Sequence, residues 1–98
     1  MRQIRNFLDE AGRLTGFPAK RKMKIYALEH LAGKFAPGVV YTEGEVNDLL
    51  NAWHTFGDPA TLRRELYDFH FLDRTSDGRR YTLASPPPDV EAMIARIC

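Results

Sequence analysis

The sequence predicts an α+β fold that is mainly helical. Apolar side chains recur at helical spacing in several segments, and one later stretch changes to the period of 2 that is typical of strands. The 98 residues, 44% of them hydrophobic, suffice for one core. We therefore expect a single domain over residues 1–98: an N-terminal helix within 1–16, a core unit at 17–83, and a proline-rich connector with a last helix at 84–98.

Two amphipathic helices are expected in the first third of the chain. Apolar residues from position 4 to position 14 predict a helix from about residue 3 to 14, and the sequence Thr-Gly-Phe-Pro at 15–18 then breaks it. Pro18 suits the first turn of a second helix, whose apolar stripe continues to about Phe35. The Pro-Gly pair at 37–38 ends that helix with a turn.

The next elements begin at local signals. Residues 39–41, Val-Val-Tyr, predict a brief strand. Thr42 and Glu45 form a capping-box pattern, which predicts a helix over residues 43–53. Asp58 followed by Pro59 predicts the start of another helix, which we expect to end near His70.

The last part of the chain predicts a hairpin and a helix. Two segments with strand period, at 71–74 and 79–83, flank the turn sequence Thr-Ser-Asp-Gly. Asp89 can cap a short final helix with apolar residues on one side. The resulting order from Pro18 to Leu83 is typical of a winged helix, with residues 43–53 as the supporting helix, 59–70 as the candidate recognition helix and the hairpin around Asp77 as the wing.

Charge and cysteine content limit the classes of function. The net charge of +1 is not that of a protein that coats nucleic acid, but residues 1–24 carry seven bases and two acids, which permits a positive face. No apolar run reaches the ~18 residues of a membrane helix. Acids near the N-terminus argue against a signal peptide, and the one cysteine, Cys98, excludes an internal disulfide, so we expect a cytoplasmic protein.

Several motifs resemble those of a known family. They are FPAKRK at 17–22, YTEGEVN at 41–47, LRREL at 62–66 after Asp58, LDR at 72–74 and DGRRY at 77–81. Over residues 17 to 83 the chain resembles a prokaryotic domain family of unknown function, which occurs as small stand-alone proteins and attached to transcriptional regulators. The resemblance implies a place in transcriptional control. The family usually has glycine where this chain has His70, so the helix exit must use a residue that is less tolerant of positive φ.

The candidate recognition helix carries the first set of candidate DNA-binding residues. On a helical wheel its solvent face lies opposite Leu62 and Leu66. Arginines there can bind guanine edges or phosphates, with hydroxyl groups as hydrogen-bonding neighbours. The alternative is internal pairing, of Arg64 with Asp68 and of Arg63 with an acid on the supporting helix such as Glu45 or Asp48. The candidates are Thr61, Arg63, Arg64 and Tyr67.

Two further basic groups could contact DNA. Flexible cations at the start of the second helix could neutralise phosphates, or could be a solvated helix start. An arginine just past the wing turn could enter a minor groove, or could belong to a solvated hairpin. The residues of these two groups are Lys20, Arg21, Lys22, Lys24, Arg79 and Arg80.

Other chemistry finds little support in the sequence. His54 and Asp58, with His30 or His70, could suggest a metal site, but Asp58 has a better use as a helix cap. Cys98 has no base or cation in an activating arrangement. Phosphate-binding glycine loops, nucleophile elbows and zinc motifs are not found. We therefore expect no metal, no cofactor and no enzymatic activity.

The sequence thus leaves two functional hypotheses open. The first is a DNA-binding winged-helix protein that regulates transcription by binding duplex DNA. The alternative is a winged-helix module for protein–protein interaction or dimerisation that does not bind DNA. A homodimer through the terminal helices fits both hypotheses. The apolar residues that would form it are Ile4, Phe7, Leu8, Met93, Ile94 and Ile97.

Overall fold

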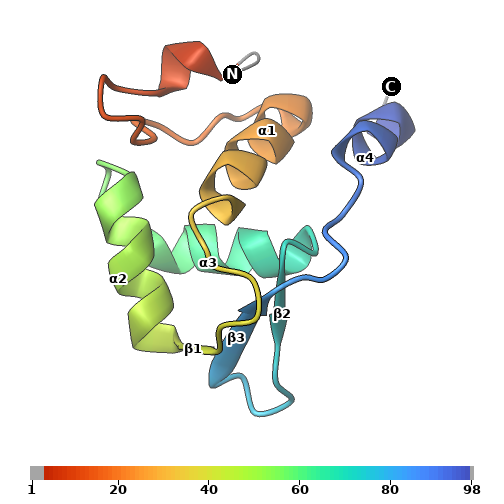
Figure 1. Cartoon of the computed structure of the whole chain (residues 1–98). Helices are drawn as coiled ribbons and strands as arrows, with labels where there is room; N and C mark the ends of the chain where they lie inside the picture. Colours follow the sequence, from red (N-terminus) through yellow and green to blue (C-terminus); the bar gives the residue numbers. More distant parts are fainter. Residues whose placement is uncertain (1–3, 98) are drawn as a thin grey trace.

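The computed structural model describes residues 4–97, without the side chain of Ile97 (Figure 1). This part of the chain forms four α-helices and a small antiparallel sheet of three strands, which confirms the mainly helical α+β class. The helices are α1 (Arg21–Ala32), α2 (Glu43–Trp53), α3 (Pro59–Asp68) and α4 (Val90–Ile97). The strands are β1 (Tyr41–Thr42), β2 (Leu72–Arg74) and β3 (Arg80–Leu83).

The N-terminal segment corrects the first prediction, because it is not an α-helix. Its described residues form one short 3-10 helix, Arg5–Phe7, and then a loop. The Asp9 carboxylate accepts hydrogen bonds from the N–H groups of Ala11 and Arg13. In a continuing α-helix these two N–H groups would donate to backbone carbonyls instead. The N–H of Leu14 donates to the carbonyl of Trp53 at 2.8 Å, so the segment is bound to the end of α2.

The predicted second helix and first strand form with different limits. The helix, α1, begins at Arg21 and not near Pro18, because Lys20 has extended backbone angles and is the N-cap. It ends at Ala32, before the predicted limit at Phe35. The strand begins at Tyr41, so that two predicted strand residues, Val39 and Val40, remain 41% and 57% exposed outside it.

Helices α2 and α3 begin as predicted. The Thr42 hydroxyl accepts from the N–H of Glu45, and the Glu45 carboxylate accepts from the N–H of Thr42, which completes the capping box. Asp58 accepts from the N–H of Thr61, and Pro59 is the first residue of α3. The cap geometry thus confirms both starts.

The end of α3 uses His70 where the resembled family usually has glycine. The N–H of Phe71 donates to the carbonyl of Leu66, and the N–H of His70 donates to the carbonyl of Tyr67. This pair of bonds is a Schellman motif, which requires a left-handed residue after the helix. His70 supplies it with a φ of 68°, a conformation that glycine adopts with less strain. The helix therefore ends at Asp68, two residues before the predicted limit.

The predicted hairpin forms and carries the sheet. Strand β3 is central, with β1 and β2 antiparallel on either side, and Tyr81 lies opposite both Tyr41 and Arg74. The turn between β2 and β3 is held by the Asp77 carboxylate, which accepts from the Thr75 hydroxyl and from the N–H of Arg79. Asp89 caps α4 through the N–H of Ala92, as predicted.

The core lies around α1, which stands between α2 and α4 (Figure 1). Leu28 and Leu31 of α1, Leu50 of α2 and Leu62 and Leu66 of α3 are fully buried. Burial of such side chains is the largest favourable contribution to the free energy of folding.

The apolar residues expected to form a dimer interface pack largely on the chain itself. Ile4 and Ile94 are buried, and Phe7, Leu8 and Met93 are half-buried against the core. The side chain of Ile97 is not among the side chains that the structure describes. The apolar faces of the terminal segments therefore find partners within one molecule, and a homodimer stays a prediction.

Candidate nucleic-acid interface

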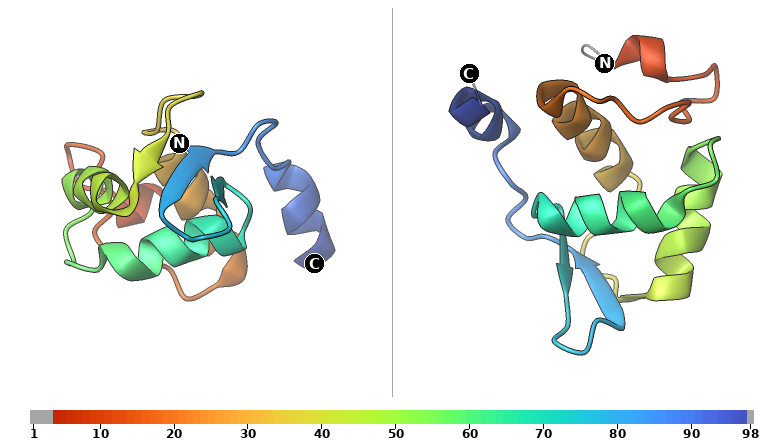
Figure 2. Two further views of the ribbon diagram at one scale, coloured as in Figure 1. Left: turned by 90° about the horizontal axis from the view of Figure 1, so that it is seen from below. Right: turned by 180° about the vertical axis from the view of Figure 1, so that it is seen from behind.

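Helix α3 exposes one long face and buries the other. Leu62 and Leu66 point into the core, whereas Ala60, Arg64 and Asp68 are exposed. Seen from behind, α3 crosses in front of the molecule, with the hairpin below it and α1 above it (Figure 2). The exposed face of α3 and two flanking basic segments thus lie on one side of the protein.

Arg63 turns away from this face toward α2. Its guanidinium donates a hydrogen bond to the side-chain oxygen of Asn47 and lies 3.9 Å from a carboxylate oxygen of Glu43. The Arg63 side chain is only 17% exposed. The alternative expected for Arg63 was pairing with Glu45 or Asp48 on the supporting helix. The acid that Arg63 approaches on this helix is instead Glu43. The Glu45 carboxylate is used in the capping box.

Arg64 stays on the exposed face. Within residues 4–96 it has no ion pair, so the expected alternative of pairing with Asp68 is wrong. The pKa of Asp58 is lowered mainly by hydrogen bonds with the Thr61 side chain and backbone, and the positive charge of Arg64 lowers it further. Arg64 is therefore a cation that the fold leaves open to solvent.

The residues of α3 that were predicted to bind DNA line one depression of about 200 Å³ together with two residues of the hairpin. The Arg74 guanidinium lies 4.0 Å from the centre of the Tyr67 ring, which fixes a second cation beside Arg64. A side-chain hydrogen bond with Tyr81 is the main cause that raises the pKa of Arg74. The lining residues are Ala60, Thr61, Arg63, Arg64, Tyr67, Arg74 and Tyr81.

Sequence reasoning missed Arg74 and Tyr81. Their positions follow from the observed hairpin register, in which Arg74 lies opposite Tyr81. Counting outward from the Thr75–Gly78 turn would instead pair Arg74 with Arg79, so the turn sequence alone does not place Arg74 and Tyr81 opposite each other. The contact of Tyr67 with the hairpin cannot be predicted from the strand register either, since it depends on how α3 is placed over the sheet.

The turn of the hairpin carries two exposed arginines, Arg79 and Arg80. They line a second depression, of about 480 Å³, together with the N-terminal residues of α2 from Thr42 to Gly44. Hydrogen bonding from the Thr75 hydroxyl is the main cause that lowers the pKa of Asp77. The Asp77 carboxylate thus stabilises the turn, while the side chains of Arg79 and Arg80 remain exposed.

The basic cluster at the start of α1 consists of Lys20, Arg21, Lys22 and Lys24. The start of α1 lies on the other side of α3 from the hairpin (Figure 2). Two of its four cations contact the protein itself: the Lys24 ammonium lies 3.4 Å from a Glu65 carboxylate oxygen, and the Arg21 guanidinium lies 5.0 Å from the centre of the Phe69 ring. Lys20 is exposed and Lys22 half-buried. The structure therefore places this cluster and the β2–β3 hairpin, whose turn carries Arg79 and Arg80, on opposite sides of α3.

His54 has a structural environment. It is 4% exposed, its Nδ1 donates to the carbonyl of Leu50 at 2.6 Å, and its Nε2 accepts from the N–H of Asp58 at 2.9 Å. Both ring nitrogens are thus occupied by backbone groups. Within the described residues no group of three or more His, Cys, Asp or Glu side chains could hold a metal ion. Cys98 lies outside them.

The helices between residues 4 and 97 are all too short or too polar to cross a bilayer. Comparison with family models matches residues 13–83 to a family described as "uncharacterized protein conserved in bacteria" (DUF2087). Comparisons with curated proteins and with solved structures gave no match. The matched segment includes every residue of the candidate interface and more than half of the chain. The chain therefore belongs to this family of uncharacterized bacterial proteins.

Proposed function

We propose that this chain is a cytoplasmic winged-helix protein that binds duplex DNA and regulates transcription. In this proposal α2 and α3 form the helix-turn-helix, and the β2–β3 hairpin is the wing. The element order and the sheet order β1-β3-β2 support this assignment. Support for a role in regulation comes from the resemblance to domains that are attached to regulators.

One observation carries the DNA-binding proposal. Arg64 on the exposed face of α3 and Arg74 on the hairpin line the same depression, together with Thr61 and Tyr67. Arginine can bind guanine edges with two hydrogen bonds, and it can also bind phosphates. Arg64 would therefore enter the major groove, and Arg74 would contact the flanking backbone.

The flanking cations would contact phosphates on both sides. Arg79 and Arg80 would serve the wing, and Lys20, Arg21 and Lys22 would act at the start of α1. Lys24 contributes less in this scheme, because its charge is paired with Glu65. Arg63 has a positioning role, since it connects α3 to Asn47 of α2.

Fluorescence anisotropy tests this proposal. Purified protein is titrated into a labelled mixed-sequence duplex at about 50 and about 200 mM salt, because each neutralised phosphate adds roughly −0.9 to the slope of log affinity against log salt. We expect binding that weakens with salt, and a large loss in Arg64→Gln/Arg74→Gln. The variant Arg5→Gln/Arg13→Gln removes the same charge from the N-terminal segment and should bind nearly as the natural chain does.

The alternative is a protein-interaction module without DNA binding. A specific observation favours it: Val39 and Val40 are exposed directly before β1, which is an edge strand of the sheet. Edge strands can pair with a segment of another protein. Absence of DNA binding at the lower salt, by a protein that is folded, would overturn the first proposal and make this alternative the working one.

A further inference from the structure

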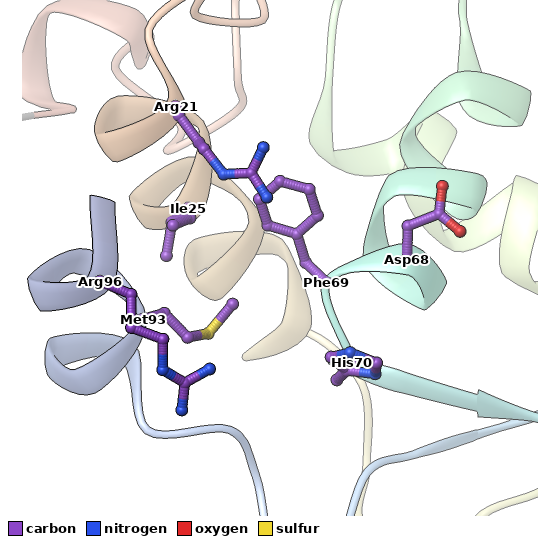
Figure 3. Close-up of a pocket in the computed structure, with 7 residues that line it drawn as sticks. All are labelled: Arg21, Ile25, Asp68, Phe69, His70, Met93 and Arg96. Atoms are coloured by element: carbon purple, nitrogen blue, oxygen red, sulfur yellow. The ribbon is translucent and has the colours of Figure 1, made fainter.

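Another depression, of about 430 Å³, lies between the start of α1, the end of α3 and α4 (Figure 3). Small-ligand sites in proteins commonly have volumes of about 300–1,000 Å³. Of the residues proposed above to contact DNA, Arg21 alone lines this depression. The depression is therefore a site distinct from the surface formed by Arg64 and Arg74.

One part of the lining is apolar. Ile25 of α1 is buried, and Phe69 and Met93 are half-buried at the end of α3 and on α4. Figure 3 shows Met93 extending from α4 toward Phe69, with Ile25 above Met93 on α1. A hydrocarbon chain or an aromatic ring placed here would remove these side chains from water, which favours binding.

The other part of the lining is cationic. Arg21 approaches from α1 and Arg96 from α4, and neither has a carboxylate within ion-pair distance in the described part of the chain. The Asp68 carboxylate, the acid in the lining, points away from both guanidinium groups (Figure 3). The Phe69 ring faces the Arg21 guanidinium at 5.0 Å, and stacking of this kind leaves the N–H edge of a guanidinium open to an anion.

We propose that this depression binds a small carboxylate with an apolar body. Arg21 and Arg96 attract the carboxylate, and Ile25, Phe69 and Met93 contact the apolar body. Each of the three elements that line the site supplies part of it, so the ligand is held between α1, α4 and the end of α3. Binding of this ligand does not depend on DNA binding by the protein.

Methionine methyl resonances report on this site. Of the three methionines, Met93 lines the depression and Met23 of α1 does not, so that the ¹³C-labelled methyl groups of Met93 and Met23 give a reporter and an internal reference. The probe is phenylacetate at neutral pH, and phenylacetamide is its uncharged analogue of the same shape. We expect a saturable shift of the Met93 methyl signal with phenylacetate, and on the order of tenfold weaker binding of phenylacetamide, because arginine–carboxylate hydrogen bonds are charge-assisted.

A double variant tests the role of the two arginines. Arg21→Gln/Arg96→Gln should abolish the preference for the carboxylate, while Arg5→Gln/Arg13→Gln, with the same net charge, should retain it. Three results would overturn the proposal: no saturable shift at Met93, equal binding of the two probes, or an unchanged preference in Arg21→Gln/Arg96→Gln. Circular dichroism confirms that each variant is folded. Because no DNA is present, failure here is separate from failure of the DNA-binding proposal.

Discussion

Arg63 of α3 donates a hydrogen bond to the side-chain oxygen of Asn47 on α2, while its neighbour Arg64 stays exposed and has no ion pair within residues 4–96. Successive residues of an α-helix are rotated by about 100°, so neighbours face different surroundings. The two arginines therefore have different roles. Arg63 connects two helices, and Arg64 is available to a partner.

This difference predicts opposite effects of two alanine substitutions. Arg63→Ala should lower the free energy of unfolding by about 1–2 kcal/mol, because it removes a half-buried charged hydrogen-bond donor and the packing of its side chain. Arg64→Ala should change that free energy by no more than about 0.5 kcal/mol, as exposed substitutions usually do. Urea denaturation followed by circular dichroism measures both.

A double-mutant cycle with Asn47→Ala identifies the partner of Arg63. If the hydrogen bond carries the effect, the loss on removing Arg63 should be smaller when Asn47 is already alanine. Losses that add without coupling would show that Arg63 acts through its packing alone. Equal destabilisation by Arg63→Ala and Arg64→Ala would contradict the distinction itself.

A glycine at position 70 should stabilise the protein. His70 has a φ of 68°, and a left-handed conformation costs a residue with a side chain roughly 1–2 kcal/mol. Glycine avoids this cost but gains freedom in the unfolded chain, so we expect His70→Gly to raise the free energy of unfolding by about 0.5–1 kcal/mol. Thermal and urea unfolding measure the change. His70→Ala serves as the control and should give no such gain, because alanine keeps the side-chain strain.

Asp58 should contribute to a loss of stability in acid. Hydrogen bonds with the Thr61 side chain and backbone hold the pKa of Asp58 below its ordinary value of 3.8 in the folded protein. Its stabilising contribution is therefore fully present above that ordinary value and is lost as the pH falls through the folded pKa. Asp58→Asn keeps a good helix cap but cannot titrate, so its stability should fall less on acidification.

Urea unfolding at a series of pH values between neutral and about 3 tests this prediction. Asp9 and Asp77 also have lowered pKa values, mainly through hydrogen bonds from Arg13 and Thr75, so the variant should retain part of the acid sensitivity. Asp48→Asn removes an exposed carboxylate that caps no helix and should follow the natural chain. An identical pH dependence for Asp58→Asn and the natural chain would rule out the proposed contribution of the cap.

Part of the candidate interface could be predicted and part could not. The exposure of Arg64 follows from helical spacing relative to Leu62 and Leu66, and that of Arg79 and Arg80 follows from their place beside a turn. The contact between Arg74 and Tyr67 does not follow from any pattern, because the two residues belong to different elements. Nor does the partner of Arg63, which depends on how α2 and α3 pack.

The sequence by itself determined the starts of α2, α3 and α4 and the position of the hairpin. Thr42, Asp58, Asp89 and Asp77 hydrogen-bond to groups within three residues of themselves, so these signals are complete in a short stretch of chain. Only the tertiary structure decided the form of the N-terminal segment. Its apolar spacing is compatible with a helix, but Leu14 gains backbone partners at Trp53 and Thr55, which are distant in sequence. Interactions between distant segments override local propensity because they also bury the apolar side chains that a lone helix would leave in water.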